Sequence, residues 1–483
     1  MSRKLVLAVV DGMHPGSLQR AIDTGRAPVL AALAERGAGV RTACAAFPSV
    51  TPVCAATIAT GVRQDVHRIP SMNWWHREEA RYVEYGSSFG AARRFGVVQQ
   101  LTDTIYNMNL EHLPAEVPTI FERLDDAGLR TAGTTYLMYR GRHEHRPARD
   151  TPLARIASTV IRRPVMGPRE LFYADVFASR ETGCRSTLGL PGVRDQHSGC
   201  VGAHLVEHDL FDFLLLSLPD NDTHSHKLGP DAQVTSIGAA DRQLDRLVHA
   251  AGGIDAFLDD HAVIAVADHS HALIERTIAL REAFEAFAVA GPGAARRREA
   301  EVALCPNQRA AMLYALVPEG RAELVPRLVA TARGVEGVDL TCWRPAPREG
   351  AIARGEAELR FAPGGDLRDA RGGAWSVEGD LGALDLRVED GVLRGDTYPD
   401  ALGRVWSALT CPTSGDVVLS AAPGWEFPDW GDMDHVGGGS HGSLHRSDSL
   451  GALVACGVEG LQEPEGGWSI ADVAPAIARH FGA

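Results

Sequence analysis

The sequence predicts an α/β fold built around a mainly parallel sheet. Two short, almost wholly apolar runs, residues 5–10 and 211–218, are typical of strands buried on both faces of such a sheet. Predicted amphipathic helices alternate with runs of this kind along much of the chain. The chain has 483 residues, which is long enough for one large α/β domain with insertions or for two to three smaller domains.

The predicted elements are those of a large core with two insertions. They are strands at 5–10, 130–136, 211–218, 261–267, 310–315, 415–422 and 453–456, and helices at 27–37, 52–61, 118–128, 233–251, 321–333 and 470–481. We expect a core formed by 1–271 and 409–483, an irregular cap at about 137–202, and a smaller α+β insertion at 272–408. The strand at 415–422 is expected to return to the core sheet.

Composition restricts the class of partner. The chain has 48 Lys and Arg residues against 62 Asp and Glu residues, a net charge of −14, which argues against a nucleic-acid duplex and against an anionic membrane as partners. An acidic protein that handles an anionic substrate must concentrate positive charge locally, and bound metal would supply that charge.

The eight cysteines are scattered without a CxxC pair, which argues against a zinc ribbon or a redox motif. In so long a chain this pattern favours free thiols in a reducing compartment. The apolar run after Met1 is too short for a signal peptide, and no other segment is long enough to span a bilayer, so we expect a cytoplasmic protein.

Asp and His residues follow four predicted strands or adjoin them. They are Asp11, the overlapping pairs Asp220/His224 and Asp222/His226, the adjacent Asp268 and His269, and His441. The spacing of four residues would place either of the overlapping pairs on one face of a helical turn, and it does not choose between them. Because open α/β sheets bind ligands at the carboxyl ends of their strands, we expect these groups to meet at one edge. Oxygen and nitrogen ligands without sulfur suit two zinc ions or, less readily, manganese.

The segment from Phe47 to Gly61 is predicted to be a loop that enters a helix of small residues. We expect Thr51 to be its N-cap and Pro52 its first helical residue. The Thr51 hydroxyl would then lie where backbone N–H groups and the helix dipole favour an anion, as a nucleophile facing a phosphoryl group would. A purely structural capping threonine is the alternative.

Trp74 and Trp75 lie in a predicted loop of aromatic and polar residues at 66–76. The pair could stack on an apolar group of a substrate, or it could close the hydrophobic core. The sequence favours neither interpretation.

These motifs together resemble the alkaline phosphatase superfamily, and most closely its nucleotide pyrophosphatase/phosphodiesterase branch. The segment 47–61 is similar to the nucleophile segment of that branch, with Thr51 at the position of the nucleophile. Asp222, His226, Gly229 and Pro230 resemble its Asp-x-x-x-His-x-x-Gly-Pro motif, which favours Asp222/His226 over Asp220/His224. The remaining similarities are Asp11-Gly12 to its first ligand turn, Asp268-His269 to its Asp-His-Gly and Ser440-His441-Gly442 to its last ligand turn.

The resemblance implies an alkaline-phosphatase-like three-layer αβα core and two divalent metal ions, Zn²⁺ with Mn²⁺ as the alternative. One ion would be held by Asp222, His226 and His441. The other would be held by Asp11, Asp268, His269 and the oxygen of Thr51. The implied activity is hydrolysis of a small phosphoric ester, as by a phosphodiesterase or nucleotide pyrophosphatase, through a phospho-threonine intermediate.

Alternatives on the same metal core are a phosphomonoesterase, a phosphonate hydrolase and a phosphomutase; an alternative of another class is a non-catalytic, metal-stabilised binding protein. The chain departs from the branch at Cys54, where an asparagine is usual, and at Ser270, which replaces a glycine. His271 is expected to support a ligand, and the roles of Lys227, His224 and His445 stay open.

Overall fold

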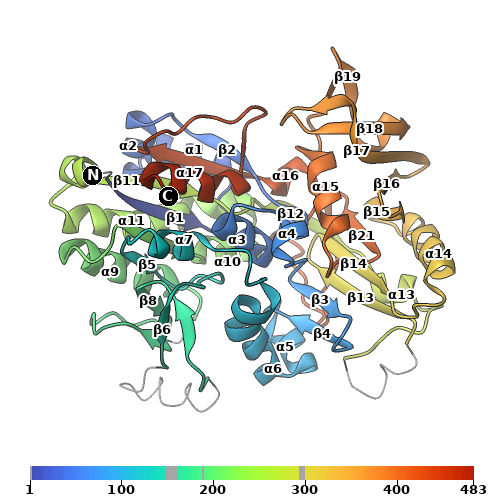
Figure 1. Cartoon of the computed structure of the whole chain (residues 1–483), viewed down its shortest axis with the longest axis horizontal. Helices are drawn as coiled ribbons and strands as arrows, with labels where there is room; N and C mark the ends of the chain where they lie inside the picture. Colours follow the sequence, from blue (N-terminus) through green and yellow to red (C-terminus); the bar gives the residue numbers. More distant parts are fainter. Residues whose placement is uncertain (1–2, 148–160, 188–189, 293–299) are drawn as a thin grey trace.

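The computed structural model describes residues 3–147, 161–187, 190–292 and 300–483. Two nine-stranded sheets dominate these residues and lie beside one another (Figure 1). The first contains strands from residues 4–266 and 450–469, and the second contains strands from residues 302–421, drawn in yellow to orange. The predicted α/β class is confirmed.

The first sheet is the mainly parallel one. In spatial order its strands are β25 (Trp468–Ser469), β2 (Arg41–Cys44), β24 (Leu450–Cys456), β11 (His261–Val266), β1 (Lys4–Val10), β10 (Phe213–Leu218), β5 (Thr131–Gly133), β8 (Glu170–Tyr173) and β9 (Phe177–Ala178). The central strand β1 pairs in parallel with β10 on one side and with β11 on the other. Strand β24 is antiparallel to both of its neighbours.

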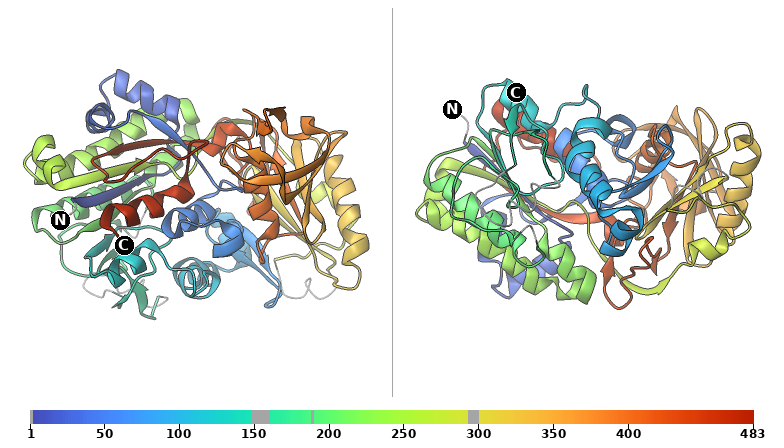
Figure 2. Two further views of the ribbon diagram at one scale, coloured as in Figure 1. Left: turned by 45° about the horizontal axis from the view of Figure 1, so that its top comes forward. Right: turned by 90° about the horizontal axis from the view of Figure 1, so that it is seen from below.

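Helices cover both faces of the first sheet (Figure 2). One face packs against α1 (Pro15–Asp23), α2 (Pro28–Arg36), α9 (Arg194–Glu207), α11 (Gln233–Ala250) and α12 (Ile254–Asp260), and the other against α3 (Thr51–Thr60), α7 (Ile120–Asp126) and α17 (Val473–Phe481). Along β1, Val6 and Ala8 join the first of these layers, whereas Leu5 and Leu7 join the second, because successive side chains of a strand point to opposite faces. The expected three-layer αβα core is confirmed.

The second sheet is almost wholly antiparallel. Its strands in spatial order are β13 (Val302–Asn307), β14 (Ala310–Ala315), β21 (Val417–Ala421), β15 (Val338–Ala346), β16 (Glu349–Arg354), β17 (Ala357–Asp369), β20 (Val392–Arg394) and β19 (Arg387–Glu389), with β18 (Ala374–Gly379) also paired to β17. Helix α14 (Arg321–Arg333) lies where the sequence predicts it, and α15 (Ala401–Thr410) packs near β15 and β21.

The strand expected at 415–422 does form, as β21, but its expected place in the core sheet is wrong. It lies between β14 and β15 of the second sheet. All five residues of β21 are buried, as those of a core strand would be, so the apolar pattern cannot tell which sheet the strand joins.

The expected cap at 137–202 is only partly separate from the core. Strands β6 (His143–His145) and β7 (Val165–Gly167) form a two-stranded ribbon of their own. By contrast, β8 pairs with β5 and α9 packs on α11, so both extend the core. Strand β8, with four residues, gives too short a pattern to predict. Parts of this prediction, at 148–160 and 188–189, lie outside the described residues.

Other helices and strands lie outside the two large sheets. They are α4 (Gln64–His67), the hairpin β3 (Asn73–His76) and β4 (Arg81–Glu84), α5 (Phe89–Phe95), α6 (Val97–Thr102), the π-helix η1 (Asp103–His112), α10 (Asp220–Leu228), β12 (Ala272–Thr277), α13 (Leu280–Ala283), β22 (Gly424–Glu426), β23 (Gly439–Ser440) and α16 (Arg446–Ser449). Trp74 and Trp75 on β3 are only 1% and 4% exposed and belong to the main hydrophobic core. The packing interpretation of this pair is therefore the correct one.

Two cysteines correct the expectation of free thiols. Cys184 and Cys200 form a disulfide, with Cα atoms 5.9 Å apart, whereas the other six cysteines are free and buried. The two cysteines are brought together because α9 folds back along the segment that follows β9. No short Cys motif in the sequence predicts this pairing. Among the described helices, none is long and apolar enough to cross a bilayer.

Candidate active site

The carboxyl ends of three adjacent strands, β10, β1 and β11, form one edge of the first sheet. Asp11 directly follows β1, and Asp268 and His269 follow β11. Helix α10 begins just after β10 and presents Asp222 and His226 one turn apart, because residues four apart share a helix face. The main-chain topology alone therefore brings these five ligand-type side chains to one edge.

Two further residues reach this edge from elsewhere. His441 follows β23, which pairs with β12 just after β11 in the chain. Thr51 is the first residue of α3 rather than its N-cap: Val50 is the N-cap, in an extended conformation, and no side chain caps the helix. The predicted N-cap was thus wrong by one position, and the Thr51 hydroxyl is free to lie 3.3 Å from His269 Nε2.

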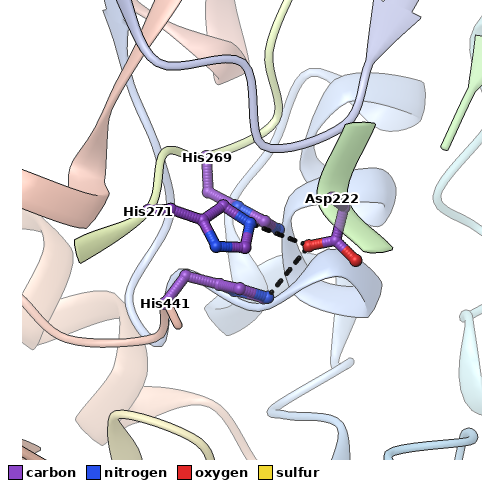
Figure 3. Close-up of side chains that lie close together, drawn as sticks. All are labelled: Asp222, His269, His271 and His441. Atoms are coloured by element: carbon purple, nitrogen blue, oxygen red, sulfur yellow. Dashed lines mark hydrogen bonds and ion pairs between the residues drawn. The ribbon is translucent and has the colours of Figure 1, made fainter. Parts of the chain in front are cut away.

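The Asp222 carboxylate is surrounded by imidazoles. Its Oδ1 lies 3.5 Å from His441 Nε2 and 2.9 Å from His271 Nε2 (Figure 3). The same Oδ1 lies 3.2 Å from His226 Nε2. Ligand atoms of Asp222, His269, His271 and His441 all lie within 4.8 Å of one another. Ligand atoms at about 2.0–2.1 Å from one tetrahedral ion are roughly 3.3 Å apart, so the contacts of 3.2 and 3.5 Å leave room for a cation.

A second group adjoins the first through His269. The Nε2 atom of His269 lies 3.4 Å from Asp11 Oδ1 and 3.5 Å from Asp268 Oδ2. Ligand atoms of Asp11, Asp268 and His269 also lie within 4.8 Å of one another. All seven residues proposed as ligands from the sequence therefore come together in two adjoining groups.

Backbone carbonyls orient three of the histidines. His226 Nδ1 lies 2.8 Å from Gly439 O, His441 Nδ1 lies 2.8 Å from Ser49 O, and His269 Nδ1 lies 3.2 Å from Ser270 O. A neutral imidazole that donates through Nδ1–H leaves Nε2 unprotonated, and here each Nε2 faces a carboxylate. Facing lone pairs are unfavourable unless a positive charge lies between them, so this arrangement fits a bound cation.

The electrostatics lead to the same conclusion. Burial, followed by the charges of Asp268 and Asp222, raises the pKa of Asp11 well above its usual value, and Asp11 Oδ1 has no hydrogen-bond donor among the described residues. Burial also disfavours the charged form of Asp222, but the facing imidazoles of His226 and His271 outweigh it and hold the pKa of Asp222 well below its usual value. A metal ion would supply the positive charge that these carboxylates lack.

The neighbouring candidates have other partners. Asp220 accepts hydrogen bonds from the backbone N–H of Gly192 and of Asp195 and from the Arg194 guanidinium, so it anchors the start of α9. His224 and Lys227 line a groove between α10 and α11 together with Arg242. His445 caps α16 by accepting from Ser447 N. These contacts support Asp222/His226 as the pair in the site.

Tyr136 is a residue near the site that the sequence analysis did not single out. It is 6% exposed, and its hydroxyl has no hydrogen-bond partner among the described residues. Burial, followed by the charges of Asp268 and Asp11, raises its pKa well above the usual value, so the phenol stays protonated near these carboxylates. Its position just after β5, the strand next to β10, was a signal that could have found it. Cys54, by contrast, is fully buried in the core.

The chain is similar to known proteins in sequence and in fold. The family model for type I phosphodiesterase / nucleotide pyrophosphatase matches residues 5–444. Solved structures of similar fold include phosphonoacetate hydrolase from Sinorhizobium meliloti 1021, at 18% identity and a TM-score of 0.55, covering 99% of this chain and 96% of that one. Human ectonucleotide pyrophosphatase / phosphodiesterase 5 matches at 13% identity and a TM-score of 0.56, with 99% and 95% covered. No curated protein sequence matches the chain.

Proposed function

This chain belongs to the type I phosphodiesterase / nucleotide pyrophosphatase family, whose members are phosphoric ester hydrolases, and we propose that it hydrolyses phosphodiesters or nucleotide pyrophosphates with Thr51 as nucleophile. The observation that supports this most directly is the position of Thr51 Oγ, 3.3 Å from His269 Nε2 and next to the Asp11–Asp268 group. Thr51 does not cap α3, so helix capping does not explain why its hydroxyl faces a cluster of ligand atoms.

We assign one ion to Asp222, His226 and His441, and the other to Asp11, Asp268, His269 and Thr51 Oγ, and we propose Zn²⁺, with Mn²⁺ as the alternative, because all the ligands are oxygen or nitrogen. The ions would lower the pKa of the Thr51 hydroxyl and neutralise charge on the phosphoryl and leaving oxygens.

The residues of the chain orient an in-line displacement. Thr51 gives up its hydroxyl proton to solvent as Oγ bonds to phosphorus and the bond from phosphorus to the leaving oxygen breaks, and the leaving oxygen takes up a proton from solvent. Water then breaks the phospho-threonine bond and restores the hydroxyl. The positive end of the α3 dipole, at Thr51, stabilises negative charge on the phosphoryl group.

The test is hydrolysis of bis-p-nitrophenyl phosphate and p-nitrophenyl phosphate by metal-quantified protein. We expect Thr51→Ala to lose at least about 10³-fold in kcat while Asp11, Asp268 and His269 still hold the second ion, because the hydroxyl that would form the intermediate is removed. Thr51→Ser, which keeps a hydroxyl, should retain part of the activity. Full activity in Thr51→Ala would rule out this nucleophile, and a higher kcat/KM for the monoester would rule out the proposed diester preference.

We propose the cytoplasmic location that the short N-terminal apolar run and the scattered cysteines predict, and the Cys184–Cys200 pair offers a test of it. Alkylation of Cys184 and Cys200 in protein isolated without reductant tests it, since thiols that react would support a reducing compartment. A disulfide that resists alkylation would argue for an oxidising one.

A further inference from the structure

His271 differs from the other imidazoles of the site in its hydrogen bonds. It lies in the loop between β11 and β12 and is 1% exposed. Its Nδ1 has no hydrogen-bond partner among the described residues, whereas the Nδ1 atoms of His226, His269 and His441 all face carbonyl oxygens. Its Nε2 lies 2.9 Å from Asp222 Oδ1, the shortest of the three imidazole contacts to that oxygen.

This difference decides where the imidazole proton lies. A neutral imidazole carries one N–H, and only the Nε2 of His271 has an acceptor within hydrogen-bond distance. The proton therefore lies on Nε2 and is donated to Asp222. An Nε2 that carries a proton cannot bind a metal, so His271 is unlike His226 and His441, whose Nε2 lone pairs are free.

The ring also fills the space beside two glycines that flank ligands. A Cβ atom on Gly12, which follows Asp11, would lie 2.6 Å from His271 Nε2. A Cβ atom on Gly439, two residues before His441, would lie 3.0 Å from His271 Nδ1. The His271 imidazole thus contacts Asp222 and closely approaches the turns that carry Asp11 and His441.

We propose that His271 is a positioning residue of the metal centre: it holds the Asp222 carboxylate through Nε2–H and sets the spacing of the turns that carry Asp11 and His441. The inference rests on the proposed function, because it concerns how this chain prepares the ligands that the two ions would need. Such supporting partners typically change metal affinity by about 10–100-fold.

Competitive chelator titration of Zn²⁺ or Co²⁺ measures this role without any substrate. We expect His271→Ala to weaken the binding of one of the two ions by about 10–100-fold. His271→Gln keeps an N–H donor and should recover most of that affinity. The visible spectrum of the Co²⁺ protein should keep the same form in His271→Gln, since no ligand is lost. A changed Co²⁺ spectrum without rescue by Gln would make His271 a ligand and overturn the inference.

A double-mutant cycle with Gly12 tests the spacing. Gly12→Ala should weaken metal binding in the wild-type background and do so much less in His271→Ala, where the imidazole no longer occupies the space. Gly25→Ala is the matched control: Gly25 has φ +68 against +66 at Gly12, and a Cβ atom there would meet nothing within 4 Å. Additive effects of Gly12→Ala and His271→Ala would contradict the proposed contact.

Two measurements separate the possible failures. Thermal melting of the metal-free variants shows whether any of them has lost its fold. If the wild type binds no divalent ion, the proposed function itself fails. If the wild type binds two ions and every folded His271 variant binds them equally well, only the positioning role fails.

Discussion

Two buried polar clusters lie at opposite ends of the segment 439–449. At one end His441 faces Asp222 in the candidate active site. At the other end Asp448 pairs with Arg309, which enters from the turn between β13 and β14 of the second sheet; both side chains are fully buried, 2.6 Å apart. Asp448 also accepts from Ser443 N and Ser443 Oγ, both at 2.7 Å.

The comparison shows how a buried carboxylate is satisfied with and without an internal cation. Asp448 has its cation in Arg309, and it accepts its remaining side-chain hydrogen bonds from Ser443 and Ser447. Asp11, Asp222 and Asp268 form ion pairs only with histidines among the described residues, and no Arg or Lys reaches them. Since buried charges must be paired, the second pattern indicates a cation that comes from outside the chain.

The largest effect is expected from a substitution in the cluster that lacks an internal cation. Asp222→Asn keeps the shape of the side chain but removes the negative charge, so we expect the loss of one of two ions and at least about a 10³-fold loss in kcat, because a metal ion contributes several kcal/mol to such a reaction. Metal analysis and p-nitrophenyl ester hydrolysis measure both effects.

Asp220→Asn is the matched control, two residues away on the same helix, where the carboxylate pairs with Arg194. It should keep both ions and most of the activity. Loss of metal in Asp220→Asn with none in Asp222→Asn would reverse the choice between the two overlapping Asp/His pairs.

The next largest effect is expected from a substitution in the cluster that has its own cation. Arg309→Met leaves Asp448 buried without a counter-ion and should lower the free energy of unfolding by about 3–5 kcal/mol. Because Arg309 N also donates to His441 O at 2.9 Å, the backbone contact survives, and metal content should change little in the protein that remains folded. Urea unfolding of the metal-free protein measures the stability.

The exposed pair Arg36–Asp255 provides the comparison for this stability effect. Its side chains are 42% and 83% exposed, so Arg36→Met should cost at most about 1 kcal/mol. Equal costs for Arg36→Met and Arg309→Met would show that burial of the pair has no energetic consequence.

A third buried carboxylate, Glu84 on β4, extends the comparison, because in the part of the chain that the structure describes it has neither an arginine partner nor a group of metal-ligand side chains around it. It is 1% exposed and accepts from Gly86 N and Ser87 N, while its Oε2 has no partner among the described residues. Burial raises its pKa from 4.5 to about 7, although the two N–H bonds act the other way. A buried carboxylate without a cation therefore tends to stay protonated.

The sign of the resulting pH dependence follows from the raised pKa. Below pH 4.5 the group is protonated in both states; as the pH rises to about 7 only the unfolded state ionises, so stability falls. The raised pKa corresponds to about 3 kcal/mol, which is lost in full above pH 7. Glu84→Gln should remove this part of the fall between pH 5 and pH 8, measured by urea unfolding.

Glu78→Gln, a substitution at an exposed position of the adjoining turn, should leave the pH profile as in the wild type. If Glu84→Gln showed the same fall in stability as the wild type, Glu84 would be ionised in the folded protein and the comparison of the three carboxylates would fail.

Local pattern was sufficient for much of the fold and of the site. The apolar runs of β1, β10 and β11 and the spacing of Asp222 and His226 depend only on neighbours in the chain. Contacts between distant segments were not predictable: β21 fits either sheet, and Trp74 could pack or bind. The disulfide of Cys184 and the placement of Tyr136 near the charges of Asp268 and Asp11 likewise depend on how distant segments of the chain meet. For the same reason, the hydrogen bond of His271 to Asp222 appears only when the segments that follow β10 and β11 are brought together by the fold.

The placement of β1 at the centre of the first sheet has a consequence for the order of folding. Leu5 pairs with Phe213 on one side and with Ala262 on the other, and β11 in turn pairs with β24, so the innermost strand of the sheet is made first and is paired late. Pairings this distant in the chain close slowly, because the entropy of long loops is lost before any contact stabilises them. The nascent chain therefore carries an unpaired, mostly apolar strand until the residues of β10, 213–218, have been made, and its yield should depend on chaperones that bind such segments.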